Sequence, residues 1–123
     1  MIGVDLVKIS RIEKMVERFG DKALKRFLNE SEIKEAKKIE SIAGYWAAKE
    51  AISKALKTGI GKELGFKDII IYKESSGAPN FRLHPDKKKK FNIRSSSLSI
   101  SHDGGFAIAV AAVELGSPAS HEG

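Results

Sequence analysis

A long helical segment near the middle of the chain constrains the fold more than any other feature. Residues 41–57 repeat apolar side chains with the period of an α-helix, and Thr58-Gly59-Ile60-Gly61 follows with glycines suited to a left-handed helix stop. Because small groups allow close approach, we expect one side of this helix to pack against a β-sheet. That side carries Ala48, Ala51, Ile52, Ala55 and Leu56. The opposite side, which should point away from this core, carries Trp46, Glu50, Ser53, Lys54 and Lys57.

Shorter segments on both sides of this helix supply the strands. An apolar run at residues 2–4 precedes a helical pattern over residues 9–19, and Asn29-Glu30-Ser31-Glu32 is typical of a capping box. Strand patterns follow at residues 68–73, 80–83, 98–101 and 106–113, and His102-Asp103-Gly104-Gly105 is a strong hairpin signal. The sequence therefore predicts a single small α+β domain over residues 1–115, with an antiparallel sheet packed against the long helix. We expect the polar residues 116–123 to form a mobile C-terminal tail.

Length and composition exclude several classes of protein. A chain of 123 residues is long enough for one domain and too short for two ordinary ones. It has no cysteine and therefore no disulfide framework. No run approaches the length of a membrane span, and the first residues lack the pattern of a secretory leader. We therefore expect a cytoplasmic protein that does not enter a membrane.

The formal net charge of +6 predicts a surface that attracts anions. The basic residues do not form a nucleic-acid motif, because the run Lys87–Lys90 lacks the interleaved aromatic side chains of a base-stacking platform. We interpret this run as the solvated face of a short helix that follows Pro85 and ends at Phe91. The charge favours acidic small molecules and acidic proteins as partners, and we expect no nucleic-acid partner.

Two acidic residues, Asp5 and Glu50, lie at positions where the formation of the fold does not require a carboxylate. Asp5 falls at the expected junction of the first strand and the first helix, where it could cap that helix. Glu50 lies on the outward side of the long helix, where it could form a solvated pair with Lys54 worth about 0.2–0.5 kcal/mol. Carboxylates also suit Mg²⁺, which proteins bind through one or two of them together with phosphate and water. On these residues alone, both interpretations stay open.

Four motifs in a fixed order carry a family resemblance. They are Gly3-Val4-Asp5, the segment from Trp46 to Lys54 with Lys49-Glu50-Ala51 inside it, Thr58-Gly59-Ile60-Gly61, and Ser99-Ile100-Ser101-His102-Asp103. In this order they resemble the bacterial holo-acyl-carrier-protein synthases, the small 4′-phosphopantetheinyl transferases of fatty acid synthesis. The resemblance runs from Ile2 to about Glu114 and is most specific over residues 46–54. It implies the 4′-phosphopantetheinyl transferase fold and a Mg²⁺-dependent enzyme that transfers 4′-phosphopantetheine from coenzyme A to a serine of apo-acyl carrier protein, with release of adenosine 3′,5′-bisphosphate.

The resemblance assigns residues to the metal and to the chemistry. Asp5 and Glu50 match the two metal ligands of the family, and Lys54 is placed to neutralise the phosphate of the leaving group. Lys49 is either a phosphate contact or a support of the helix. The group that accepts the serine proton stays unassigned, because a metal-bound water and Glu50 are both candidates.

The resemblance also implies a coenzyme A pocket. Ser101, His102 and Asp103 match the segment that lines it in the family, although a histidine beside a hairpin turn is often a surface residue satisfied by hydrogen bonds. Three adjacent residues at a strand end alternate in direction, so they do not form a hydrolase triad. Gly59 and Gly61 could let the backbone approach the nucleotide, and a helix stop explains them equally well.

One position departs from the family pattern. Many members carry arginine where this chain has Tyr45, so the phosphate or carrier contact made there by others is not expected here. The metal ligands and Lys54 are intact.

Assembly and carrier docking complete the expectations from the family. Small side chains at Ala107, Ala109 and Ala111 fall on one face of the last strand. A helix of the same chain could cover this face, or, as the trimers of the family imply, a neighbouring subunit could approach it, with active sites between subunits.

Arg11 matches the arginine that family members use against the acidic helix of the carrier protein. Lys22, Lys25 and Arg26 add positive charge nearby, and a merely solvated basic surface is the alternative.

Two other functions are compatible with a basic surface. A non-enzymatic binder of coenzyme A or carrier protein would need neither carboxylate, so metal dependence separates it from the enzyme. A small nucleic-acid module would bind with a steep salt dependence and show no preference for coenzyme A.

Overall fold

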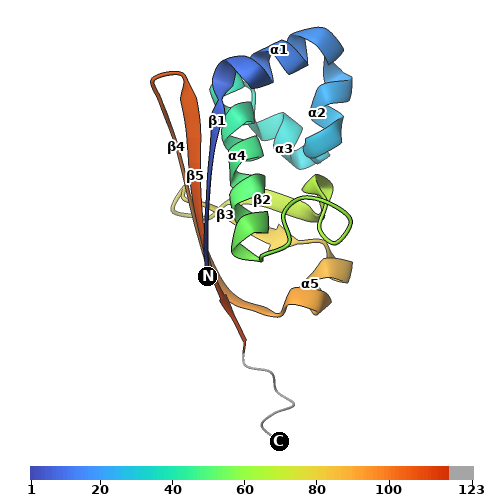
Figure 1. Ribbon diagram of the computed structural model, residues 1–123, viewed down its shortest axis with the longest axis vertical. Coiled ribbons are helices and arrows are strands. Elements are labelled where there is room, and N and C mark those ends of the chain that lie inside the picture. Colours follow the sequence, from blue (N-terminus) through green and yellow to red (C-terminus); the bar gives the residue numbers. More distant parts are fainter. Residues whose placement is uncertain (117–123) are drawn as a thin grey trace, which may run out of the picture.

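The computed structural model describes residues 1–116, and the elements follow one another as Figure 1 shows. The predicted tail lies outside the described residues except for Gly116. In chain order the elements are β1 (Ile2–Lys8), α1 (Ile9–Phe19), α2 (Asp21–Phe27), α3 (Glu30–Glu35), α4 (Ile39–Ala55), the 3-10 helix η1 (Phe66–Asp68), β2 (Ile69–Lys73), β3 (Pro79–Leu83), α5 (Pro85–Phe91), β4 (Ile93–Asp103) and β5 (Phe106–Leu115).

The strands form two antiparallel sheets. The larger sheet has the order β1-β5-β4, and β2 pairs with β3 in the smaller one. Figure 1 shows the larger sheet edge-on along one side of the molecule, with α4 beside it and with α1, α2 and α3 beyond α4. The predicted hairpin joins β4 to β5 through Gly104 and Gly105, whose φ angles of 57° and 85° give the tight two-residue turn that such a pair favours. The predicted antiparallel sheet packed against a long helix is confirmed.

Alanines from both layers fill the space between α4 and the sheet. On α4, Ala48 and Ala51 are fully buried, and on β5 so are Ala107, Ala109 and Ala111. Two layers of small side chains bring the helix axis close to the strands. Of the two alternatives for the alanine face of β5, coverage by a helix of the same chain is therefore confirmed.

The side of α4 that faces away from the sheet is not solvated throughout. Lys54 and Lys57 are exposed as expected, but Ser53 is fully buried, and so is Lys49 between the two sides. The prediction for Ser53 was wrong, because the period of one helix does not reveal which of its residues the rest of the chain covers. For Lys49 the cover comes from α2, α3 and η1, to which its ammonium group is hydrogen-bonded.

The face of the sheet that α4 does not cover is apolar. Ile2, Val4 and Leu6 of β1 are 71%, 52% and 56% exposed, and Ile108 and Val110 of β5 lie beside them, at 37% and 39%. Side chains alternate along a strand, so these residues point away from the alanines. A contiguous apolar face of this kind marks an interaction surface.

Two shorter helices follow the sequence predictions. Asn29 and Glu32 form the predicted capping box at the start of α3, and α5 carries Lys87–Lys90 and ends at Phe91. Within residues 1–116, none of the helices has the length and apolar character needed to cross a membrane.

Candidate functional site

Asp5 lies in the middle of β1, directly opposite Ala109 of β5. The prediction that it sits at a strand-to-helix junction was wrong, because pairing with β5 continues to Lys8 and carries the strand three residues further. Lys8, and not Asp5, is the residue before the first turn of α1. A helix-capping role is thereby excluded. Asp5 instead shares the inward face of β1 with Gly3 and Val7, and its side chain is only 14% exposed.

Gly3 sets how closely β1 approaches α4. A Cβ atom built at Gly3 would overlap the carbonyl oxygen of Ala51 and lie 2.6 Å from the backbone nitrogen of Ala55. Only glycine permits this contact of strand and helix. The contact places Asp5, two residues along the same face, beside the turn of α4 that carries Glu50 and Lys54.

Lys54 joins the strand and the helix across this contact. Its ammonium group donates to Asp5 Oδ1 at 2.8 Å and to the carbonyl oxygen of Val4 at 3.2 Å. Among the described residues the ion-pair partner of Lys54 is therefore Asp5, and the solvated pair with Glu50 that helical spacing allowed is not formed. Since Lys54 is 51% exposed, the pair contributes little to stability.

Glu50 faces the same group of charges. Partial burial raises the pKa of the Glu50 carboxyl, and the negative charge of Asp5 raises it further, while Lys54 and Arg11 oppose the shift. Two carboxylates that repel one another beside a basic surface form a place where a bound cation would relieve the repulsion.

The described residues contain no cluster of three or more His, Cys, Asp or Glu side chains that could enclose a metal ion. Asp5 and Glu50 alone fit Mg²⁺, which takes one or two carboxylates and completes its shell with substrate phosphate and water. The donor set therefore suits an ion held jointly by protein and substrate.

Arg11 belongs to this site as well as to the surface of α1. Its guanidinium group lies 5.7 Å from the centre of the Trp46 ring, in a cation–π arrangement. Trp46 in turn packs against Phe27 and Phe66, at ring-centre distances of 5.1 and 4.6 Å. The aromatic cluster packs against Arg11 through Trp46, and the charge of Arg11 stays close enough to affect the pKa of Glu50.

Lys49 lies inside the protein. Its side chain is fully buried, and its ammonium group donates to Glu32 Oε1 at 2.7 Å and to the carbonyl oxygens of Phe27 and Phe66 at 2.7 and 3.1 Å. With its donors engaged and no exposed surface, Lys49 supports the helix and cannot reach a nucleotide. The prediction that it binds the cofactor is corrected accordingly, because the side of α4 that carries it is covered by α2, α3 and η1.

Three residues at the end of β4, Ser101, His102 and Asp103, were predicted to contact coenzyme A, and they do not all lie on one face of the strand. His102 lines a cavity of about 180 Å³ together with Tyr45, Ile100, Pro79 and Glu40. Ser101 lies on the opposite face of the strand. Asp103 stays beside His102 at the hairpin, where both line a larger cavity of about 620 Å³ together with Ser10, Glu13 and Glu40. The structure thus brings only His102 of these three beside Tyr45.

The two glycines of the loop after α4 serve different purposes. Gly59 has a φ angle of 66° and donates its N–H to the carbonyl oxygen of Ser53. The first left-handed residue after the helix is Lys57, with a φ angle of 65°, so the prediction that glycine supplies the stop was wrong. Gly61 needs no left-handed conformation and donates to the carbonyl oxygen of Leu64. A Cβ at either position would meet nothing within 4 Å, which leaves the backbone accessible.

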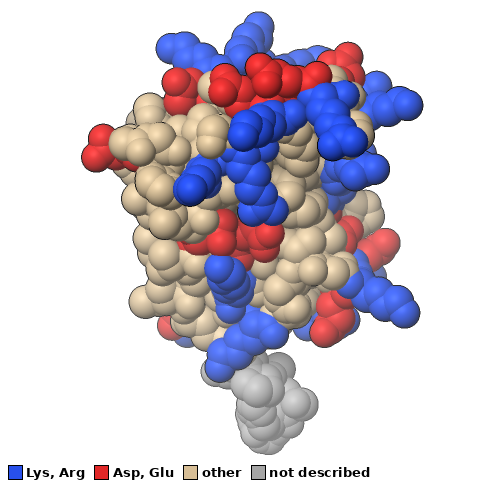
Figure 2. Space-filling model, turned by 45° about the horizontal axis from the view of Figure 1, so that its top comes forward, with Lys and Arg blue, Asp and Glu red and all other residues tan. Residues whose placement is uncertain are grey.

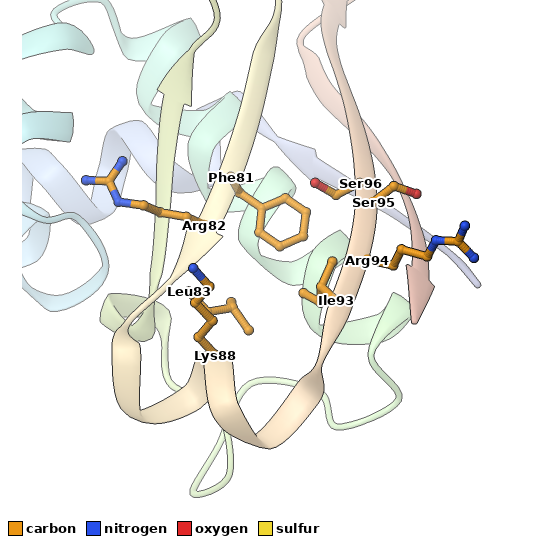
Figure 3. Close-up of a pocket in the computed structure, with 8 residues that line it drawn as sticks. All are labelled: Phe81, Arg82, Leu83, Lys88, Ile93, Arg94, Ser95 and Ser96. Carbon is orange, nitrogen blue, oxygen red and sulfur yellow. The ribbon is translucent and has the colours of Figure 1, made fainter. Parts of the chain in front are cut away.

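A second cavity, of about 190 Å³ between β3 and β4, contains none of the predicted site residues. Figure 3 shows Phe81 and Ile93 directed into it, while the guanidinium groups of Arg82 and Arg94 point away. The candidate site lies elsewhere, at the contact of β1 with α4.

Figure 2 shows basic side chains gathered over the end of the molecule formed by α1 and α2, with a small acidic patch below them that has basic side chains above and below it.

The carboxylates of Asp5 and Glu50, with the cationic groups of Lys54 and Arg11 beside them, have the chemistry that a divalent cation and a phosphate require. The model of the 4′-phosphopantetheinyl transferase superfamily matches residues 1–111, and the chain belongs to this family.

Individual relatives agree. The chain is 58% identical to a holo-[acyl-carrier-protein] synthase of Nitratiruptor over 92% of this chain and 97% of that protein. It is 61% identical to the synthase of Nautilia profundicola, over 89% and 95%. The crystal structure of the Helicobacter pylori synthase in complex with coenzyme A superposes with a TM-score of 0.89 at 57% identity, and covers 93% of this chain and 100% of that one.

Three contributors to the site were missed from the sequence. Gly3 was quoted only as part of a motif, although a glycine on the inward face of a strand is a signal of close backbone approach. The Arg11–Trp46 stack and the buried partner of Lys49, Glu32, join segments that no local pattern connects.

Proposed function

We propose that this protein transfers the 4′-phosphopantetheine group from coenzyme A to a serine of apo-acyl carrier protein and releases adenosine 3′,5′-bisphosphate. The observation that carries the proposal is the meeting of Asp5 and Glu50 beside Lys54, in a chain whose relatives are holo-[acyl-carrier-protein] synthases. In the transfer, the serine oxygen forms a bond to phosphorus, the pyrophosphate bond of coenzyme A breaks, and the serine proton is lost.

Asp5 and Glu50 would hold Mg²⁺ with the pyrophosphate and water. The ion would neutralise negative charge on the pyrophosphate, which otherwise repels the incoming serine oxygen. Partial burial, and after it the charge of Asp5, raises the pKa of Glu50, and a cation shared with Asp5 would relieve the repulsion between the two carboxylates. The proton acceptor stays unassigned, because a bound Mg²⁺ would itself favour the ionised form of Glu50.

Lys54 would exchange one anionic partner for another. In the protein alone it is paired with Asp5 at 2.8 Å. Once Asp5 is a metal ligand, the half-exposed ammonium group of Lys54 is free to contact the phosphate of the leaving group. Lys54 then stabilises charge on the product as the bond breaks.

Coenzyme A would extend from this site over Gly59 and Gly61 and toward His102. The open space at both glycines allows close approach of a phosphate, and His102 offers a hydrogen-bonding group beside the ring of Tyr45. Asp103 lines a cavity beside His102 and could contact the same coenzyme A molecule. Ser101 faces the other side of the sheet, so its predicted contact would be made to a coenzyme A molecule bound across a subunit boundary.

The carrier protein would dock on α1 and α2. Arg11 is exposed on α1, and Lys22, Lys25 and Arg26 are exposed on α2. Arg26 also lies 6.0 Å from the ring centre of Phe19, which is 48% exposed. An exposed ring bordered by cations suits an acidic amphipathic helix.

A homotrimer with active sites between subunits would use the uncovered face of the sheet. The exposed side chains of Ile2, Val4, Leu6, Ile108 and Val110 form that face. The alanine face of β5 cannot serve, because α4 covers it within the chain.

Conversion of apo- to holo-carrier protein tests the proposal. We expect conversion with coenzyme A and Mg²⁺, and none after the divalent ion is removed by chelation. A protein that binds coenzyme A without converting the carrier would be the non-enzymatic binder, and salt-sensitive binding of DNA or RNA in place of coenzyme A would indicate the nucleic-acid module.

A further inference from the structure

The buried pair of Lys49 and Glu32 makes many directional contacts. Both side chains are fully buried, and the ion pair spans 2.7 Å. Glu32 Oε1 also accepts from the backbone N–H and the side-chain amide of Asn29, at 2.6 and 3.1 Å, and Oε2 accepts from the N–H of Ile71 at 2.8 Å. These contacts satisfy backbone groups of other segments, so the pair supports the fold. Because hydrogen bonds are directional, the pair also fixes where these segments meet.

The pair connects five separate segments at one point. Through Lys49 it reaches the carbonyl oxygens of Phe27 at the end of α2 and of Phe66 in η1. Through Glu32 it reaches the start of α3 and the N–H of Ile71 in β2. Lys49 itself belongs to α4, so hydrogen bonds to α2, α3 and η1 fix the position of this helix along its axis, and Glu32 links it further to β2.

The next residue on α4 is Glu50, and one turn further lies Lys54. The helix is therefore held on one side by Lys49 and Glu32 and on the other by Lys54 and Asp5. The alanine packing of α4 against the sheet is apolar, and alanine side chains make no directional contacts of this kind.

The same lysine fixes the support of Arg11. The two residues whose carbonyl oxygens Lys49 binds, Phe27 and Phe66, carry the rings that pack against Trp46. Arg11 lies over Trp46. One buried ammonium group thus orders both the helix turn that bears Glu50 and the aromatic cluster beneath Arg11.

We propose that Lys49 and Glu32 are positioning residues for the transfer reaction, which set the place of Glu50 and Lys54 relative to Asp5 and the orientation of Arg11. This inference rests on the proposed function. It predicts that activity depends on the pair beyond its contribution to folding, because a displacement of about 1 Å at a reactive centre can lower a rate by up to about 100-fold.

The test uses the double variant Lys49→Met/Glu32→Met, which removes both charges and retains apolar volume. We expect it to unfold cooperatively and yet to show a kcat reduced by about tenfold to 100-fold, with a raised Mg²⁺ concentration for half-maximal activity. The thermal shift that Mg²⁺ and coenzyme A together produce in the wild type should shrink in the variant. A folded double variant with wild-type kcat, Mg²⁺ dependence and thermal shift would overturn the proposal.

A core variant away from the pair serves as the matched control. Leu83→Ala removes a buried side chain from β3 and should lower the melting temperature while kcat and the Mg²⁺ dependence stay unchanged in the folded protein. If the double variant fails to fold, the variant Asn29→Ala tests the proposal instead. It removes one hydrogen-bond donor to Glu32 and leaves both charges in place. Asn29→Ala should shift the Mg²⁺ dependence in the same direction, and a normal dependence there contradicts the proposal. An inactive wild type would instead contradict the proposed function.

Discussion

The ammonium group of Lys54 lies 2.8 Å from the carboxylate of Asp5, so the residue proposed to bind phosphate is paired with a residue proposed to bind the metal. The contact brings the half-exposed ammonium group of Lys54 to one location with Asp5 and the nearby charge of Glu50. If Asp5 binds the metal as proposed, metal binding and release of Lys54 would be coupled, since both involve Asp5.

Replacement of either carboxylate tests the metal pair. Asp5→Ala and Glu50→Ala should each lower kcat/KM by at least about 100-fold, because several kcal/mol of charge stabilisation are lost. Both variants should stay folded, since the ion pair of Asp5 with the half-exposed Lys54 contributes little to stability. The control is Asp86→Ala, whose carboxylate lies on α5 and is 86% exposed. Near-normal turnover of either site variant at limiting Mg²⁺ would show that the ligands are other residues.

The raised pKa of Glu50 predicts a pH-dependent effect on stability. A carboxyl group whose pKa is higher in the folded than in the unfolded state favours folding when protonated, and this contribution is lost as the pH rises through the folded-state pKa. At neutral pH, Glu50→Gln should therefore raise the melting temperature of the metal-free protein. The difference should fade as the pH is lowered until Glu50 is protonated in the wild type, and Mg²⁺ should stabilise only the wild type. A variant that is less stable than the wild type at neutral pH would contradict the repulsion between Glu50 and Asp5.

Gly3→Ala tests the contact of β1 with α4. The added methyl group meets the backbone at Ala51 and Ala55, which cannot move aside as a flexible side chain could. We expect a loss of about 1–3 kcal/mol in the free energy of unfolding and a lower kcat, since Asp5 is displaced from Glu50. Gly65→Ala is the control, because a Cβ there makes only ordinary contacts, at 3.5 Å or more, and the φ angle of −88° suits alanine. Denaturant unfolding that leaves Gly3→Ala as stable as Gly65→Ala would refute the close approach.

Reversal of charge at Arg11 tests carrier docking. Arg11→Glu should raise the KM for carrier protein by at least about tenfold and weaken the salt dependence of kcat/KM, because charge-paired docking is screened by salt. The KM for coenzyme A should change little. Arg94→Glu, an exposed residue of β4, is the control. An equal loss of affinity for both substrates would contradict carrier docking and place Arg11 in the nucleotide site. Its position over Trp46, close to Glu50, makes that site the alternative.

Assembly is tested on the uncovered face of the sheet. Val110→Lys places a charge between Ile108 and the apolar side chains of β1 and should leave the monomer fold intact. Light scattering should then show dissociation, with loss of activity if sites lie between subunits. A fully active monomer would overturn the trimer. Ala109→Phe is unsuitable for this purpose, because Ala109 is buried under α4 and the larger ring would disrupt the fold itself.

Local patterns in the sequence predicted the helices and strands well. They did not predict which other elements each helix would pack against. The period of residues 41–57 identified α4, and the glycine pair identified the hairpin, since each depends on neighbouring residues only. The same period assigned Ser53 to solvent and left Lys49 between two roles. Both are fully buried, and Lys49 is held by α2, α3 and η1 through long-range contacts that have no local signature.

In the candidate site, too, local patterns predicted some features, and long-range contacts determined the others. Asp5 and Glu50 were identified through the family motifs, but the extent of β1 was underestimated because charged Lys8 and polar Asp5 interrupt the apolar run. Pairing with β5 overrides that local composition. The contact between Lys54 and Asp5 depends on the approach that Gly3 allows, and no spacing rule on one helix could reveal it.

The mass of apo-acyl carrier protein after incubation with this protein, coenzyme A and Mg²⁺ tests the central claim most directly. We expect the carrier to gain the mass of one phosphopantetheine group in the presence of wild-type protein, with adenosine 3′,5′-bisphosphate released in equal amount. The gain should be absent with chelator and almost absent with Asp5→Ala. A carrier whose mass stays unchanged with the wild type and Mg²⁺, under conditions where coenzyme A binds, would contradict the assignment of a transferase.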